Sequence, residues 1–215
     1  MLKLKRLLAS NKYFWKYRHL IQKNIFKKSY GVLPTKHFNK IFNKKKIISV
    51  LDFGCATGDK LEYFASKEAK YIYGIDINKK AINTCKKKFR YDKIFKNFDI
   101  SLSEKKLSEF LKRSNLKRFD LVILDRVCYI LDSKNLINIL RILCKKTKYI
   151  YIDDFFYPKK SLQLRKKIYG YNHTNFDLLL QKFNFKKSFY GKSPYKKVIN
   201  SNTKSALFKN LKSKN

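Results

Sequence analysis

Short apolar runs alternate with helical stretches along most of this chain, and no other feature of the sequence constrains its fold as strongly. The first run, 47–53, is rich in β-branched residues, which is typical of a buried strand. The alternation predicts further strands at 71–75, within 91–98, at 119–124 and at 148–152, and helices at 60–68, 79–89, 102–113 and 136–145. Because such alternation builds βαβ units, we expect a parallel sheet with helices on both faces.

The C-terminal part of the chain carries a weaker pattern. It predicts a helix at 176–183 and candidate strands at 185–190 and 205–211. The length of 215 residues suits one domain with a full core.

A loop of small residues, 54–58, joins the first strand to the first helix of this pattern. Gly54 and Gly58 permit a tight turn and a close approach of the backbone to a ligand. The second strand ends in Asp76, 18 residues after Gly58, where a carboxylate can accept hydrogen bonds from both ribose hydroxyls of an adenosine ligand. The alternative role for Asp76 is a helix N-cap.

These segments resemble the motifs of class I S-adenosylmethionine-dependent methyltransferases. Residues 51–58 resemble the first motif, 74–76 the second, 97–100 the third and 119–125 the fourth. The resemblance covers about residues 47–153 and implies S-adenosylmethionine as the cofactor. It implies that the cofactor is bound by Asp52, Gly54, Cys55, Ala56, Gly58, Asp76, Ile77, Asp99, Ile100 and Asp125.

The fold implied is α/β and Rossmann-like, a doubly wound, mostly parallel seven-stranded sheet with helices on both faces. We divide the chain into an N-terminal helical lid or extension over 1–46, a methyltransferase domain over 47–211 and a basic tail over 212–215. Trp15, Tyr17 and Arg18 are candidates for a lid over the cofactor, with a core stripe of aromatic residues as the alternative.

Two positions depart from the family pattern. Ala56 replaces the middle glycine of the first motif, and 145–148 replace the usual Gly-Gly turn before the fifth strand. A dinucleotide site is disfavoured, because Asp59 and Lys60 follow Gly58 where that fingerprint needs a third glycine. An acid beside the loop suits a ligand that carries an ammonium group.

The methyl acceptor is expected above the carboxyl ends of the first, fourth and fifth strands. Side chains expected there are Asp125, Arg126, Tyr129, Asp153 and Asp154. We predict Asp153 as a catalytic residue, with a capping or loop pair of both acids, stabilised by the basic surroundings, as the alternative. His173 is a second catalytic candidate because the usual imidazole pKa lies near neutrality; a polar-loop or helix-capping role is the alternative. No metal site is predicted.

Residues 127–131 resemble small-molecule methyltransferases, and the segment after the fourth strand lacks both the Asn/Asp-Pro-Pro-Tyr/Phe and the Pro-Cys signatures of nucleobase methylation. The predicted reaction is therefore transfer to an O or N atom of a small molecule, such as a sugar, lipid or metabolite intermediate. An RNA methyltransferase and a non-catalytic S-adenosylmethionine-binding protein are the alternatives.

Lysine and arginine total 52 against 15 acidic residues, a net charge of +37. This charge predicts non-specific contact with RNA or an anionic membrane surface, with a merely solvated lysine-rich surface as the alternative. No apolar run is long enough to span a membrane or to act as a signal peptide, so a cytoplasmic protein is expected. The four cysteines form no C-x-x-C pair and are expected to be buried thiols.

Overall fold

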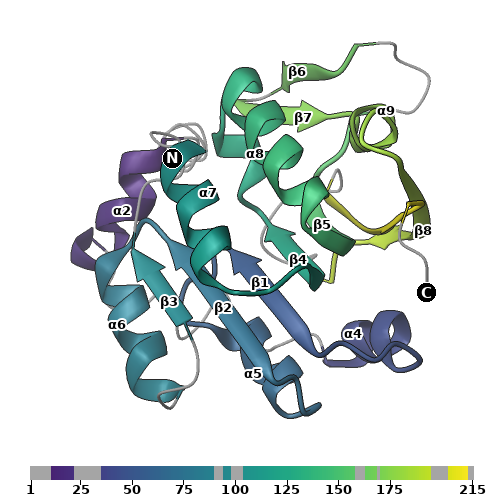
Figure 1. Cartoon of the computed structure of the whole chain (residues 1–215). Helices are drawn as coiled ribbons and strands as arrows, with labels where there is room; N and C mark the ends of the chain where they lie inside the picture. Colours follow the sequence, from purple (N-terminus) through teal and green to yellow (C-terminus); the bar gives the residue numbers. More distant parts are fainter. Residues whose placement is uncertain are drawn as a thin grey trace.

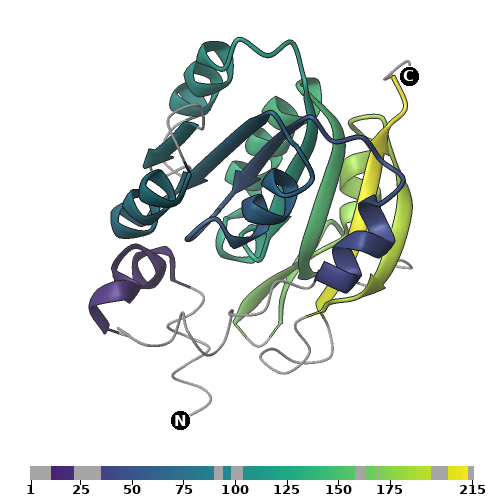
Figure 2. The ribbon, with the colours of Figure 1, turned by 90° about the horizontal axis from the view of Figure 1, so that it is seen from below.

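The computed structural model describes residues 11–21, 35–89, 94–97, 104–157, 163–168, 170–194 and 203–212. This part of the chain forms a seven-stranded sheet covered by helices on both faces (Figures 1 and 2). The predicted Rossmann-like α/β fold is confirmed.

Five strands of the sheet are parallel, in the spatial order β3-β2-β1-β4-β5. They are β1 (Ser49–Phe53), β2 (Tyr71–Asp76), β3 (Ile94–Asn97), β4 (Phe119–Asp125) and β5 (Thr147–Phe155). Antiparallel β9 (Thr203–Asn210) pairs with β5, and β8 (Phe185–Lys192) forms the edge beyond it. The strand order reverses between β1 and β4, and ligands of open α/β sheets bind at such a reversal, beyond the carboxyl ends of the strands.

Two apolar layers hold the helices to the sheet. One face packs against α7 (Glu104–Arg113), α8 (Ser133–Lys145) and α9 (Phe176–Gln181). The other packs against α4 (Thr35–Phe42), α5 (Asp59–Ala65) and α6 (Lys79–Lys88). None of the helices within the described ranges has the length and apolarity needed to cross a bilayer.

The N-terminal segment 1–46 contains two described helices with different surroundings. In α4, Phe38, Ile41 and Phe42 are buried against α5 and β5, so this helix belongs to the core. In contrast, α2 (Lys12–Ile21) lies beyond the carboxyl end of β2, where the Trp15 carbonyl accepts a hydrogen bond from Asn78 Nδ2 at 3.2 Å (Figure 1). The lid role of residues 1–46 stays a prediction.

A short hairpin between β5 and α9 was not predicted. It consists of β6 (Arg165–Ile168) and β7 (Tyr171–Thr174), paired antiparallel. Arg165 donates to the carbonyls of Cys128 and Leu131 at 2.8 and 2.9 Å, which fastens the hairpin to the 3₁₀ turn η2 (Cys128–Ile130) after β4. These strands carry little apolar pattern in the sequence, and long-range contacts stabilise them.

Candidate active site

The small-residue loop after β1 is held by backbone hydrogen bonds and by packing. The amides of Gly54 and Cys55 both donate to the Ile75 carbonyl, at 2.8 and 3.0 Å. Gly58 has φ +81°, and a Cβ there would lie 2.8 Å from the Phe89 ring. Gly58 is therefore required by the left-handed backbone and by the close packing of the α6 end against the loop.

Ala56 stands in the loop with φ +46°, in the left-handed region that glycine adopts without strain. Its amide donates to Asp76 Oδ2 at 2.8 Å. Its carbonyl accepts from the buried thiols of Cys55 and Cys85, at 3.7 and 3.3 Å. The chain thus keeps the loop conformation with an alanine in place of the middle glycine, at the cost of backbone strain.

Asp76 ties the loop to the carboxyl end of β2. Its second oxygen, Oδ1, accepts from the Asn78 amide at 2.7 Å. The N-cap of α6 is Asn78, whose side chain accepts from two helix amides, so the N-cap alternative for Asp76 is wrong. Burial raises the pKa of Asp76, and the hydrogen bonds from the Asn78 and Ala56 amides oppose that rise. Asp76 and the partly buried Ile77 stand where a Rossmann-like domain receives the ribose.

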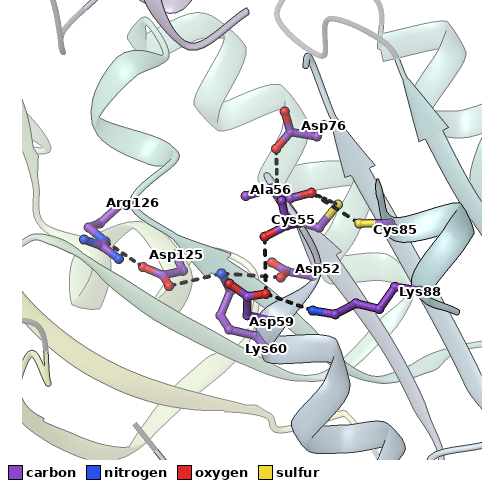
Figure 3. Close-up of polar contacts among 11 residues, drawn as sticks. Asp52, Cys55, Ala56, Asp59, Lys60, Asp76, Cys85, Lys88, Asp125 and Arg126 are labelled. Carbon is purple, nitrogen blue, oxygen red and sulfur yellow. Dashed lines mark hydrogen bonds and ion pairs between the residues drawn. The ribbon is translucent and has the colours of Figure 1, made fainter. Parts of the chain in front are cut away.

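Buried charges cluster beside this loop, under the carboxyl ends of β1 and β4 (Figure 3). Lys60 Nζ lies 3.5 Å from Asp52 Oδ2 and 3.3 Å from Asp125 Oδ2. Arg126 Nε donates to Asp125 Oδ1 at 3.0 Å. Lys60 thus bridges two strands, and the side chains of both acids are almost fully buried.

The two acids of this cluster have opposite pKa shifts. Burial raises the pKa of Asp52 to about 7, although the Lys60 ammonium acts against the rise. Burial also acts on Asp125, but Lys60 and Arg126 together hold its pKa below the usual value. The difference follows from the number of neighbouring cations, one for Asp52 and two for Asp125.

The neighbouring strand adds Asp153, which pairs in register with Asp125 on one side and Ser205 on the other. Ser193 Oγ donates to Asp153 Oδ1 at 2.8 Å. Within the described residues, the fully buried Oδ2 of Asp153 accepts no hydrogen bond. Burial and the charge of Asp125 raise the pKa of Asp153 well above its usual value. An unsatisfied carboxyl oxygen at this edge is a candidate contact for a ligand.

Asp154 points to the opposite face of β5 from Asp153 and has a structural role. Its Oδ2 accepts from the Cys128 amide at 2.9 Å, and its Oδ1 from the Phe155 amide at 2.7 Å. Burial raises its pKa to about 7, against these backbone bonds and the charge of Arg165. Asp154 therefore holds η2 in place, and the two adjacent acids do not form a paired site.

Two other sequence candidates, His173 and Tyr129, pack against the ring of Phe155. His173 is in β7, buried, with its ring centroid 5.0 Å from that of Phe155. Burial lowers its pKa, and a hydrogen bond to the backbone of Phe156 opposes this. Tyr129 is buried in an aromatic cluster with Phe155 and Tyr171. Its carbonyl accepts from Asn172 Nδ2 at 2.8 Å.

Some predicted residues lie outside the described residues, namely Asp99, Ile100 and the side chain of Arg18. One residue without a predicted role stands near the cluster. His37 Nε2, from α4, lies 3.1 Å from Ser205 Oγ and 3.3 Å from the Tyr151 hydroxyl. No local motif around His37 could have indicated these contacts, which span 168 and 114 residues.

The match to known families agrees with this arrangement. Residues 44–193 match the family model described as a methyltransferase domain, which covers more than half of the chain. The chain therefore belongs to this methyltransferase family. No curated protein matches the sequence.

Solved structures of low sequence identity share the fold. A plantazolicin methyltransferase, in complex with a pentazolic desmethyl analogue and S-adenosylhomocysteine, is 20% identical over 97% of each chain, with a TM-score of 0.61. The magnesium protoporphyrin IX methyltransferase of Synechocystis, with bound S-adenosylmethionine, is 13% identical over 92% of this chain and 94% of that chain, with a TM-score of 0.61. A candidate RNA methyltransferase from Pyrococcus horikoshii is 13% identical over 82% and 81%, with a TM-score of 0.56.

The residues present fit this cofactor. The loop at Gly54 and Gly58 brings backbone to the edge of the sheet, and Asp76 offers carboxylate oxygens for the ribose. The buried carboxylates of Asp52 and Asp125 are suited to its ammonium group. When bound, the cofactor supplies a methyl group activated by a sulfonium; the chain supplies alignment and a place for a proton.

Proposed function

We propose that this methyltransferase acts on an O or N atom of a small-molecule acceptor, such as a sugar, lipid or metabolite intermediate. The observation that carries the proposal is the buried Asp153, whose Oδ2 accepts no hydrogen bond in the described part of the chain. It lies on β5 beside Asp125, on the acceptor side of the strand reversal. A hydroxyl or amine donor on an acceptor would satisfy this oxygen.

We assign Asp153 as the general base that removes the acceptor's proton. Its Oδ2 receives the O–H or N–H hydrogen bond and takes the proton as the acceptor's lone pair forms the new bond to carbon. Burial and the charge of Asp125 raise the pKa of Asp153, which makes its carboxylate a stronger base than an ordinary aspartate. Ser193 positions the carboxyl group through the hydrogen bond to Oδ1.

The local charge favours a neutral or cationic acceptor over a polyphosphate. Asp52, Asp125 and Asp153 lie together at the carboxyl edge, with Lys60 and Arg126 as the described cations beside them. A phosphodiester at this edge would have to compete with Asp125 for Lys60 and Arg126, which both pair with that carboxylate. The names of two similar structures, the plantazolicin and magnesium protoporphyrin IX methyltransferases, also point to small acceptors.

The test is a methyl-transfer assay with radiolabelled S-adenosylmethionine against metabolite and RNA fractions of the source cell. We expect label in the metabolite fraction, and a loss of about 10²–10⁴ in kcat for Asp153→Asn with affinity for S-adenosylhomocysteine retained. Asp177→Asn, which removes a partly exposed acid paired with Lys187, is the matched control. Stoichiometric, site-specific labelling of RNA would favour the alternative to which the Pyrococcus similarity points.

A further inference from the structure

The acid that follows the glycine loop does not face the crevice. Asp59 was expected to favour an ammonium-bearing ligand, but its Oδ1 accepts from Lys88 Nζ at 3.0 Å and from Thr57 Oγ1 at 3.2 Å. Its side chain is 44% exposed. The next residue, Lys60, turns inward instead, and its side chain is only 12% exposed (Figure 3).

The position of the Lys60 ammonium defines a cation site. It lies between one carboxylate from β1 and one from β4, at 3.5 and 3.3 Å. In the described residues, neither oxygen of Asp52 accepts a hydrogen bond, and Lys60 is the cation that faces it. Two buried carboxylates beside a glycine loop at the strand reversal would bind an ammonium group from any source.

The cofactor carries such a group on its amino-acid portion, and the loop and Asp76 that would hold the cofactor lie at the same edge of the sheet. We propose that Lys60 fills the ammonium subsite of the empty enzyme, so that the α-ammonium of the cofactor must displace Lys60 to bind. The exchange replaces the contacts of the Lys60 ammonium with Asp52 and Asp125 by contacts of the cofactor ammonium with the same two carboxylates. The net contribution of the cofactor ammonium to affinity is therefore small, although two acidic side chains line the subsite.

Lys60 thereby becomes a specificity-determining residue. Displacement of Lys60 lowers the affinity for ligands that carry the ammonium group and does not change the affinity for ligands that lack it. The affinities of the two kinds of ligand therefore become more similar. The same exchange assists release of the product S-adenosylhomocysteine, because Lys60 is tethered nearby and competes for the two carboxylates at high effective concentration.

Binding calorimetry with three ligands tests this inference. S-Adenosylhomocysteine has the ammonium, its desamino analogue lacks only that group, and 5′-methylthioadenosine lacks the whole amino-acid portion. For Lys60→Gln we expect about tenfold tighter binding of S-adenosylhomocysteine, which corresponds to about 1.4 kcal/mol, and less than a twofold change for 5′-methylthioadenosine. Weaker or unchanged binding of S-adenosylhomocysteine would overturn the proposal; weaker binding would instead assign Lys60 to the ligand's carboxylate.

The matched control is Lys88→Gln. Lys88 also bridges two acids of α5, Asp59 and Glu62, at 3.0 and 2.7 Å, but on the outer surface. This variant makes the same change in net charge and should leave all three affinities unchanged. An equal gain in Lys88→Gln would show that only the overall charge matters and would refute the role of Lys60.

The wild-type protein provides an independent test in case Lys60→Gln does not fold. It should bind S-adenosylhomocysteine and the desamino analogue with affinities within about threefold of each other, since displacement of Lys60 offsets the gain from the ammonium. A desamino analogue that binds more than about thirtyfold more weakly would overturn the proposal.

Discussion

Asp52→Asn should stabilise the protein, increasingly so as the pH rises. The carboxyl group of Asp52 is fully buried on β1, and burial raises its pKa from 3.8 to about 7. In the unfolded chain the group ionises near its ordinary value, so folding must keep a proton on it at intermediate pH. The native stability therefore falls between pH 3.8 and about pH 7, which an asparagine of the same shape avoids.

The size of the effect follows from the two pKa values. The separation of 3.8 and about 7 corresponds to about 4 kcal/mol at full ionisation, because each pKa unit is worth about 1.4 kcal/mol. Between pH 5 and pH 8 the advantage of Asp52→Asn should grow by about 2–3 kcal/mol. Relaxation around a charged Asp52 would reduce this figure but would leave its sign.

The assay is urea unfolding of wild type and variant at several pH values between 5 and 8, compared as a difference. The pH dependence from Asp154, whose pKa is also raised to about 7, is common to both proteins and cancels. Asp59→Asn makes the same change in net charge at a more exposed acid that pairs with Lys88, and it serves as the comparison. A difference that stays constant over this pH range, or a variant that is less stable throughout, would refute the argument that burial dominates at Asp52.

Three further predictions concern the loop and the surface. Asp76→Ala should weaken S-adenosylhomocysteine binding ten- to a hundredfold in calorimetry, since charge-assisted ribose contacts are lost; wild-type affinity would contradict this role. Ala56→Gly should raise the free energy of unfolding by about 0.5–1 kcal/mol in urea, because it relieves the left-handed backbone at φ +46°; a lower free energy would show that the strain is absent. Bulk RNA should bind at low salt and dissociate steeply as salt rises, as filter binding would show, and salt-independent binding would point to a specific site.

The sequence was sufficient to predict the elements that repeat. Each of β1, β2 and β4 is an apolar run that ends at a turn or an acid, and buried strands between helices leave few other arrangements. The glycine loop and Asp76 were predicted for the same reason, since their roles depend on local backbone geometry. Asp76 accepts hydrogen bonds from the amides of Ala56 and Asn78, and its contact with a ribose stays a prediction.

The features that were missed depend on contacts between distant segments or on the rotation of one helix. Adjacent residues of a helix point about 100° apart, so spacing alone could not show that Lys60 faces inward and Asp59 outward. The opposite orientation of the Asp153 and Asp154 side chains could have been predicted, because alternation along a strand places neighbours on opposite faces. It was missed because the predicted strand ended at 152, whereas β5 continues to Phe155.

The chain has few acidic residues, and several of them lie at one edge of the sheet. The sequence has only 15 aspartates and glutamates against 52 lysines and arginines. Five of these acids lie at the carboxyl edge of the sheet: Asp52, Asp76, Asp125, Asp153 and Asp154. S-Adenosylmethionine carries cationic sulfonium and ammonium groups, which a net charge of +37 repels over the range of the Debye length, about 8 Å at physiological salt. Acidic groups at this edge offset that repulsion where the ligand binds, because a bound cation favours their ionised form and buried charges are screened less than charges at the surface.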